Sequence, residues 1–283
     1  MRQEMSDAEY RWFSEWITEE FGLVFGPEKK DILRARLEPR RAELGFDTFE
    51  QLYFHLKYHP DRQGEREKLI PHLTNNESYC FRETPQLDVL RDEVLGIVKK
   101  EAQAAARKEV RILSAGCASG EEAYTLAMIA QESRHFPPGG VRVTGVDLDP
   151  EALERARNAV YGPNAFRRTE VSVREKYFTP EGPDRWSPVA RVREMVAFDR
   201  ANLADGVWAK KIARQDVIFC RNVLIYFGES TMRFAAESFY EALRPGGYLF
   251  LGHAETLSRT PTRFEPVRRP GCVFYRKPEV EGA

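Results

Sequence analysis

The clearest chemical signal in the sequence is a glycine-containing loop between an aliphatic run and a helical pattern. Residues 110–114 read as a buried strand, and the segment SAGCASGEEAY that follows places Gly116 and Gly120 in the turn. Glycines let a backbone approach a ligand closely, and the first amides of a helix are free to donate hydrogen bonds. Glu121 and Glu122 stand where a diphosphate would bring negative charge. The loop therefore favours a cationic ligand that carries no phosphate.

A second acidic position ends the next expected strand, residues 141–147. Asp147 lies at the carboxyl end, where its side chain can accept hydrogen bonds from both hydroxyls of a ribose. S-adenosylmethionine (SAM) carries a sulfonium, an ammonium group and a ribose but no phosphate, so we expect SAM as the cofactor. Plainer interpretations stay open, because Asp147 could be a turn residue and the loop glutamates could simply complement the helix dipole. Asp149, directly before Pro150, is better interpreted as a helix cap.

The composition excludes several classes of protein. The 283 residues carry 43 basic and 44 acidic side chains, so no overall field attracts the chain to nucleic acid or anionic lipid. The four cysteines are widely spaced without a C-x-x-C pair, which argues against a zinc site and a disulfide framework. The amino terminus lacks the apolar core of a signal peptide, and no apolar run is long enough to cross a bilayer. We expect a cytoplasmic protein without a metal.

The front of the chain, residues 1–73, is predicted to form a helical domain. Ser6 and Glu9 have the spacing of a capping box before a first helix. A second helix is expected over residues 27–44, and the Asp47–Glu50 pair repeats the capping spacing before a third. The apolar side chains expected to face inward are Phe13, Trp16, Ile17, Ile32, Leu33, Leu37, Phe49, Leu52 and Leu56.

The rest of the chain has the pattern of a doubly wound α/β domain, which we assign to residues 109–283. Short aliphatic runs alternate with turns and helical patterns, and they predict further strands at 216–220 and 248–252. Each run is nearly all apolar, as parallel strands covered on both faces should be. Residues 272–276 could close the sheet.

Two segments stand outside this alternation. Residues 161–196 are rich in proline and charge, and we interpret them as an insertion. Residues 74–108 connect the helical front to the sheet and include an expected helix near Gln86–Glu101.

Three further motifs carry a resemblance to a known family. They are TNNESYCFRE at 74–83, DVIFCRNVLIYF at 216–227 and LRPGGYLFLGHAE at 243–255. Together with the glycine loop and the GVDLDP strand end, they resemble the chemotaxis receptor methyltransferases, the CheR family, over nearly the whole chain. The resemblance implies a class I SAM-dependent methyltransferase, with a Rossmann-like doubly wound sheet, an all-α amino-terminal domain and a small β-subdomain at about 161–196.

The resemblance also implies roles for particular residues. It predicts transfer of the SAM methyl group to glutamate side chains on methyl-accepting chemotaxis receptors, with S-adenosylhomocysteine as the second product. Tyr226 matches a tyrosine that faces the reacting centre. The residues that match cofactor-binding positions, together with the loop glycine, are Asn76, Ser78, Arg82, Gly116, Glu122, Asp147, Asn202, Leu203, Arg221 and Asn222.

The expected chemistry needs no general base. A glutamate side chain has a pKa of about 4.3, so at neutral pH it is already an ionised nucleophile. Catalysis should come mainly from holding the carboxylate in line with the methyl group and excluding water. Arg82 and Tyr226 are the candidate catalytic residues, because a guanidinium and a phenol can orient a carboxylate without removing its charge. A structural ion pair and a core aromatic are the alternatives.

A basic stripe on the second expected helix is a candidate for receptor binding. The segment KKDILRARLEPRR places Lys30, Arg34 and Arg41 four and seven residues apart. Such a face could dock the cytoplasmic helical region of a receptor, although an ordinary solvated helix face explains the pattern equally well.

Two other functions remain open from the sequence. The same fold could methylate a different protein acceptor, because fold does not choose the acceptor. A non-catalytic adaptor that binds SAM or a receptor is the second alternative. We expect a monomer that neither binds nucleic acid nor inserts into a membrane.

Overall fold

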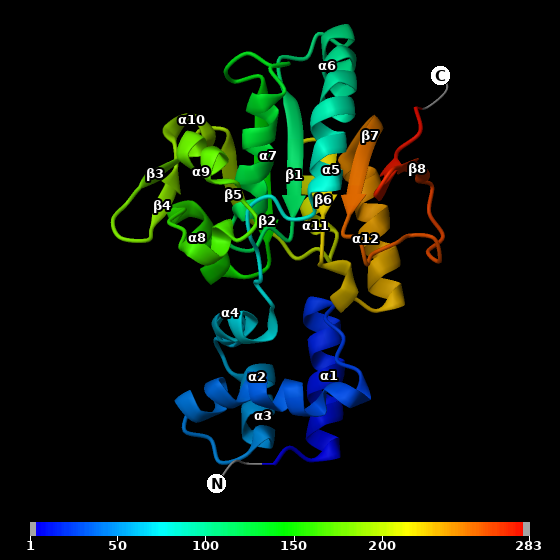
Figure 1. Cartoon of the computed structure of the whole chain (residues 1–283). Helices are drawn as coiled ribbons and strands as arrows, with labels where there is room; N and C mark the ends of the chain where they lie inside the picture. Colours follow the sequence, from blue (N-terminus) through cyan, green and yellow to red (C-terminus); the bar gives the residue numbers. More distant parts are fainter. Residues whose placement is uncertain (1–3, 280–283) are drawn as a thin grey trace. The chain divides into compact units, whose positions relative to one another are not determined.

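The computed structural model describes residues 4–279, which form two compact units (Figure 1). The smaller unit contains the described residues up to Asn75 together with Tyr226–Thr231. The larger unit contains 76–225 and the described residues from Met232 onward. None of the helices among residues 4–279 is both long and apolar enough to cross a membrane.

The smaller unit is helical, as predicted. Ser6 caps its first helix in a complete capping box, because the Ser6 hydroxyl accepts from the Glu9 amide at 3.2 Å and the Glu9 carboxylate accepts from the Ser6 amide at 2.8 Å. Its helices are α1 (Asp7–Phe21), α2 (Lys30–Glu43, after a 3₁₀ turn at Pro27–Lys29), α3 (Phe49–Tyr58) and α4 (Arg62–Leu73).

Two details of the helical prediction are wrong. The cap of α3 is Thr48, whose hydroxyl accepts from the Gln51 amide at 3.2 Å, so the capping box begins one residue after Asp47. Ile32 is 49% exposed, whereas Leu33 and Leu37 are fully buried. Leu33 and Leu37 lie four residues apart and therefore share one face, and Ile32 is about 100° away from Leu33 around the helix.

A buried ion cluster joins α2, α3 and α4. The Glu65 carboxylate contacts the Arg40 guanidinium, lies 2.9 Å from Lys68 Nζ and 3.1 Å from His55 Nε2, and its side chain is only 7% exposed. Burial raises the pKa of Glu65, but hydrogen bonds from Arg40, Lys68 and His55 outweigh it and lower the pKa to about 2. Glu65 is therefore ionised at neutral pH, and it links three helices.

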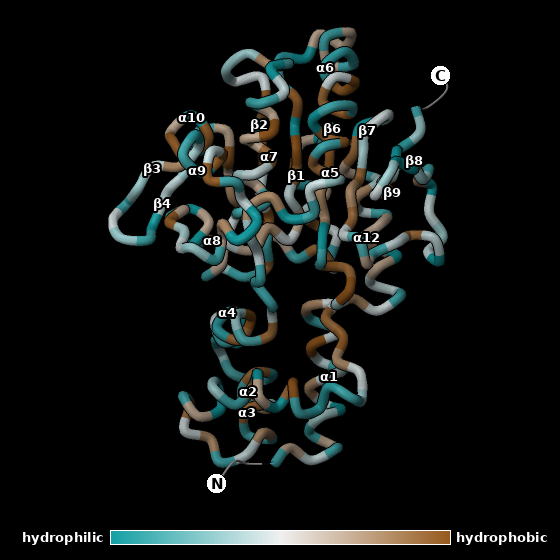
Figure 2. The backbone as a smooth tube through the Cα atoms, in the orientation of Figure 1, coloured by the Kyte–Doolittle hydropathy of each residue, from teal (hydrophilic) through white to brown (hydrophobic). Residues whose placement is uncertain are grey.

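The larger unit contains a seven-stranded sheet in the order β5-β2-β1-β6-β7-β9-β8. Strands β5, β2, β1, β6 and β7 are parallel, and β9 is antiparallel to both β7 and β8. Figure 2 shows β1 largely in the hydrophobic colours, as a strand covered on both faces requires. The bounds are β1 Val110–Ala115, β2 Val141–Asp147, β5 Val196–Arg200, β6 Gln215–Cys220, β7 Leu243–Leu251, β8 Glu265–Arg269 and β9 Cys272–Arg276.

The five predicted strands are confirmed, and two edge strands escaped prediction. β5 (VAFDR) and β8 (EPVRR) are short, and most of their side chains are exposed or only half-buried, because edge strands have little apolar surface to bury. β9 does not close the sheet, since β8 lies outside it. A doubly wound parallel core with an antiparallel edge is the resulting architecture.

Helices cover the sheet, and α6 and α7 pack along β1 (Figure 1). The expected helix near Gln86–Glu101 is confirmed, but a π-helical turn at Leu90–Val94 interrupts it. The helices are α5 (Thr84–Val89), α6 (Leu95–Ala104), α7 (Glu121–Glu132), α8 (Pro150–Asn158), α11 (Val207–Lys211) and α12 (Glu229–Ala242).

The stretch 161–196 contains a separate two-stranded antiparallel sheet. Its strands are β3 (Phe178–Pro180) and β4 (Trp186–Pro188), which pair Thr179 with Ser187. Around them lie a 3₁₀ turn at Pro163–Phe166 and the helices α9 (Val171–Tyr177) and α10 (Ala190–Arg193).

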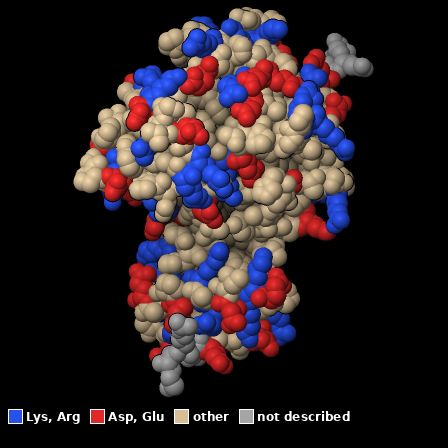
Figure 3. All heavy atoms as spheres, in the orientation of Figure 1, with Lys and Arg blue, Asp and Glu red and all other residues tan. Residues whose placement is uncertain are grey.

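Over the face shown in Figure 3, acidic and basic side chains are interspersed, in line with the balanced net charge.

Candidate active site

The glycine loop lies at the carboxyl end of β1 and starts α7. Gly116 has φ +77°, and a Cβ there would lie 2.3 Å from Val223 Cγ2 in the segment after β6. Gly120, the N-cap of α7, has φ +92° and a similarly tight contact with Ala156. Only glycine fits either position without strain, so the loop packs closely against two neighbouring elements.

Asp147 ends β2 beside this loop. Its Oδ2 accepts from the Ala118 amide at 2.7 Å and its Oδ1 from the Asp149 amide at 3.0 Å. The residue is 8% exposed, and this burial raises the pKa of Asp147 in spite of the two backbone donors. Each carboxylate oxygen keeps a further lone pair, so the pair can accept two hydroxyls of a ribose.

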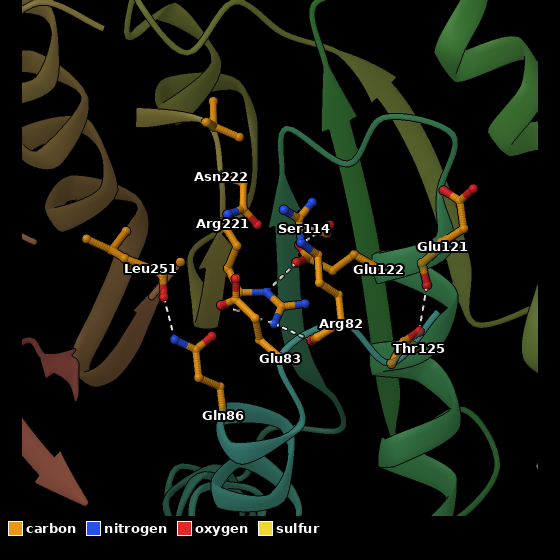
Figure 4. Close-up of polar contacts among 12 residues, drawn as sticks. Arg82, Glu83, Gln86, Ser114, Glu121, Glu122, Thr125, Arg221, Asn222 and Leu251 are labelled. Atoms are coloured by element: carbon orange, nitrogen blue, oxygen red, sulfur yellow. Dashed lines mark hydrogen bonds and ion pairs between the residues drawn. The ribbon is translucent and has the colours of Figure 1, made fainter. Parts of the chain in front are cut away.

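Glu122 and Arg221 form the central ion pair of the site (Figure 4). Glu122 Oε2 accepts from Arg221 Nε at 2.7 Å, and Glu122 Oε1 accepts from the Ser114 hydroxyl at 2.7 Å. Arg221 Nη1 donates to the backbone carbonyl of Arg82 at 2.6 Å, and its side chain is 2% exposed. The guanidinium of Arg221, just after β6, thus contacts both the first turn of α7 and the 76–83 segment. Glu83 also approaches it, with Oε2 3.9 Å from Nη1.

The adjacent Glu121 differs from Glu122. Its carboxylate accepts from Ser119 Oγ at 3.0 and 2.9 Å and from Ser78, and it is only 5% exposed. Burial raises the pKa of Glu121. Its own first-turn partners therefore satisfy this glutamate, and Glu122 is the one that reaches across to β6.

Side chains of the segment 76–83 contact both the rest of the larger unit and one another. Asn76 Nδ2 donates to Asp149 Oδ2 at 2.6 Å, and Asp149 Oδ1 caps α8 by accepting from the amides of residues 151 and 152. The prediction that Asp149 is a helix cap is confirmed. The Arg82 guanidinium donates to the Glu77 carbonyl at 3.1 Å and lies 5.5 Å from the centre of the Tyr79 ring.

Asn222 follows Arg221 at the end of β6. It adopts φ +60°, and its Oδ1 is buried without a hydrogen-bond partner among residues 4–279. A buried acceptor costs free energy unless a donor reaches it, so this atom suits an ammonium or hydroxyl group of a ligand. Asn202 and Leu203 follow the end of β5. Asn202 Oδ1 accepts from the Ala204 amide at 3.0 Å, and Leu203 is 5% exposed.

The remaining predicted site residues belong to the smaller unit. The Tyr226 hydroxyl accepts from Asn75 Nδ2 at 3.1 Å. On α2, Lys30 pairs with Asp7, and Arg34 Nε lies 3.8 Å from Asp31 Oδ1, one turn earlier on the same helix. Arg41 is turned inward, since its guanidinium contacts Glu38 and the Phe46 carbonyl and its side chain is 12% exposed.

Sequence reasoning missed Glu255, which lies in the GHAE segment after β7. Its carboxylate accepts from the backbone amides of Asn222, Val223 and Gly252 at 2.8, 2.9 and 2.6 Å. The motif was recognised in the sequence, but its glutamate binds only backbone amides. Since nearly every residue has such an amide, the residue types do not indicate which ones Glu255 contacts.

These features define the class of the larger unit. A doubly wound sheet carries a glycine loop after β1 and an acid at the end of β2, and this acid accepts a hydrogen bond from the loop. This combination is typical of a class I SAM-dependent methyltransferase.

Comparison with known proteins identifies the family. A family model described as CheR methyltransferase, SAM binding domain, matches residues 76–272, and one described as CheR methyltransferase, all-alpha domain, matches residues 8–74. The chain belongs to the CheR methyltransferase family, and SAM is its cofactor.

Curated relatives cover almost the whole chain. Chemotaxis protein methyltransferase 1 of Pseudomonas aeruginosa is 32% identical over 278 residues, which cover 96% of this chain and 99% of the relative. Chemotaxis protein methyltransferase 2 of Vibrio cholerae is 31% identical over 97% of this chain and 94% of its own length. The Escherichia coli chemotaxis protein methyltransferase is 32% identical over 93% and 89%.

Proposed function

We propose that this protein methylates glutamate side chains in the cytoplasmic helical region of chemotaxis receptors, yielding glutamate methyl esters and S-adenosylhomocysteine. The match of both of its domains to the CheR family, with relatives named chemotaxis protein methyltransferase along nearly their full length, carries the proposal. The arrangement of acids and amides at the carboxyl end of the sheet supports it.

The cofactor contacts are assigned from that arrangement. Asp147 would accept hydrogen bonds from the ribose hydroxyls, and Asn222 Oδ1 would accept from the cofactor's ammonium group. Glu122, held by Arg221, would add negative charge beside a cationic ligand. Bound SAM supplies a methyl group activated by its sulfonium. Further contacts are proposed for Asn76, Ser78, Arg82, Gly116, Asn202 and Leu203.

The acceptor carboxylate needs orientation more than activation. It is ionised at neutral pH, so the residues around it must hold its oxygen in line with the methyl group without protonating it. We assign this role to Arg82 and Tyr226. Arg82 is partly exposed, and its guanidinium contacts a backbone carbonyl and an aromatic ring, which leaves its charge available to an acceptor carboxylate.

Receptor docking is proposed for the basic face of α2. Lys30, Arg34 and Arg41 would attract acidic groups on a receptor helix. Arg41 is 12% exposed and lies 2.6 Å from a Glu38 oxygen, whereas Arg34 is 20% exposed and lies 3.8 Å from its nearest carboxylate oxygen, on Asp31; we therefore expect Arg34 to contribute more to receptor affinity. Replacing Arg34 with alanine should weaken the apparent affinity for the receptor while the affinity for S-adenosylhomocysteine stays unchanged.

The test is methyl transfer from labelled SAM to receptor-containing membranes, with a base-labile methyl ester as the readout. The proposal predicts base-labile label on the receptor with the wild type and none with Asp147→Ala. Tight binding of S-adenosylhomocysteine without label on any receptor would overturn the proposal and favour an adaptor or another acceptor.

A further inference from the structure

Glu255 gathers the backbone amides of two segments at the carboxyl end of the sheet. Its Oε2 accepts from Asn222 N at 2.8 Å and from Gly252 N at 2.6 Å. Its Oε1 accepts from Val223 N at 2.9 Å and from Ile225 N at 3.3 Å. One carboxylate therefore anchors the chain as it leaves β6 and the chain as it leaves β7.

The anchored chain at residue 222 is in a conformation that it would not readily keep alone. Asn222 has φ +60°, the left-handed region, which costs a non-glycine residue roughly 1 kcal/mol. The Asn222 amide points at Glu255 in this conformation, and a charge-assisted hydrogen bond is strong enough to hold it. The contact with Glu255 thus offsets the cost of the left-handed backbone.

The fit between the two segments is tight. A Cβ on Gly252 would lie 2.7 Å from Glu255 Oε2 and 3.0 Å from Asn222 N. Glycine is required here by space, so that the carboxylate and the Asn222 backbone can meet. The position of Asn222 therefore depends on Glu255 and on the small residue beside it.

We infer that Glu255 is a positioning residue that fixes Asn222 so that its unpartnered side-chain oxygen faces the cofactor. The inference rests on the proposed cofactor contact of Asn222. The buried Oδ1 of Asn222 is the atom that gains from this placement, because it lacks a hydrogen-bond partner among the described residues. Both carboxylate oxygens of Glu255 accept from backbone amides, so Glu255 would act on the cofactor only through the position of the 222–225 segment.

The first test is the isosteric substitution Glu255→Gln. One oxygen becomes an NH₂ group, which meets backbone donors where an acceptor is needed, whichever way the amide turns. We expect the affinity for S-adenosylhomocysteine, measured by calorimetry, to fall at least about 10-fold, the usual effect of a lost charge-assisted hydrogen bond. Glu265→Gln, an exposed acid on β8, is the matched control and should bind like the wild type.

A double-mutant cycle separates positioning from mere stabilisation. If Glu255 acts through Asn222, adding Glu255→Gln to Asn222→Ala should lower the affinity by less than about 2-fold beyond Asn222→Ala alone. Losses that multiply, or a Glu255→Gln variant that binds like the wild type, would overturn the inference.

A second variant keeps the test valid if Glu255→Gln does not fold. Gly252→Ala retains the carboxylate and presses its Cβ against the same contact, so it should also lower the affinity for S-adenosylhomocysteine. Wild-type affinity in a folded Gly252→Ala would again contradict the positioning role. Because calorimetry uses no receptor, these outcomes are independent of whether the wild type methylates a receptor.

Discussion

Glu65 in the smaller unit and Glu122 in the larger unit are both largely buried carboxylates that contact an arginine, with side chains 7% and 12% exposed. Glu65 is surrounded by Arg40, Lys68 and His55, and its pKa is lowered to about 2. Among residues 4–279, Glu122 contacts one cation, Arg221, and accepts a hydrogen bond from the Ser114 hydroxyl.

The surroundings of Glu122 also contain destabilising features. Near Glu122, burial raises the pKa of both Asp147 and Glu121, and the neighbouring backbone includes residues with positive φ at Phe81, Glu83, Ala118 and Asn222. Strained backbone and buried acids cost free energy, and they collect where a ligand can recover it. From this comparison we propose that the buried acid of the smaller unit serves stability, whereas the acids of the larger unit serve binding.

The largest expected effect is the loss of the Glu65 cluster. Glu65→Ala leaves the buried Arg40 without its buried partner and with only the exposed Glu43, which should lower the free energy of unfolding by about 4 kcal/mol. Urea denaturation measures this loss. The control Glu43→Ala removes the exposed partner of Arg40 and should cost less than about 1 kcal/mol. If Glu65→Ala also abolished binding of S-adenosylhomocysteine in folded protein, the division of roles would be wrong.

Acidification should break the same cluster. The folded pKa of Glu65 is about 2, below its ordinary 4.5, so its contribution is complete above about pH 4.5 and is lost as the pH falls toward 2. A shift of this size corresponds to about 3 kcal/mol across the window. The difference in unfolding free energy between wild type and Glu65→Gln, followed by denaturation at several pH values, should shrink accordingly. A difference that does not change with pH would reject this assignment.

Asp147 provides the opposite case. Asp147→Ala should weaken the binding of S-adenosylhomocysteine roughly 100-fold, because it removes the acidic side chain that we propose as the acceptor of the ribose hydroxyls. Since burial raises the pKa of Asp147, its removal should cost little stability, less than about 1 kcal/mol. Calorimetry and thermal unfolding of the same sample measure both quantities. A large loss of stability with unchanged affinity would make Asp147 a structural turn residue.

The smallest expected effect concerns the first helix. Ser6→Ala removes the hydroxyl that accepts from the Glu9 amide and donates to the Glu9 carboxylate, and it should cost about 1 kcal/mol of stability. Thr48→Ala, at the capping box of α3, should cost a similar amount. Neither should change cofactor affinity, and a change in affinity measured by calorimetry would show that the helical unit influences the cofactor site.

Local patterns made part of this molecule predictable. The cap at Ser6, the glycine loop and the acid at the end of β2 depend on neighbours within a few residues, so the sequence reveals them. The edge strand β8 could not be predicted, because its exposed, charged residues have no apolar alternation.

Long-range contacts explain the other failures. Glu255 contacts backbone amides more than 30 positions earlier in the chain, and no side-chain pattern records such partners. Likewise, the Arg41 guanidinium contacts the Phe46 carbonyl and the Phe49 ring beyond the end of α2, and the charge pattern of α2 does not indicate these partners.

The most direct test of the central claim is to map the methylated residue on a receptor fragment by mass spectrometry after reaction with SAM. The account predicts one added methyl group on glutamate side chains, removed by mild base and missing from fragments treated with Asp147→Ala. A base-stable methyl group on lysine or arginine would contradict glutamate methylation. Consumption of SAM without a methyl group on any receptor peptide would contradict it as well.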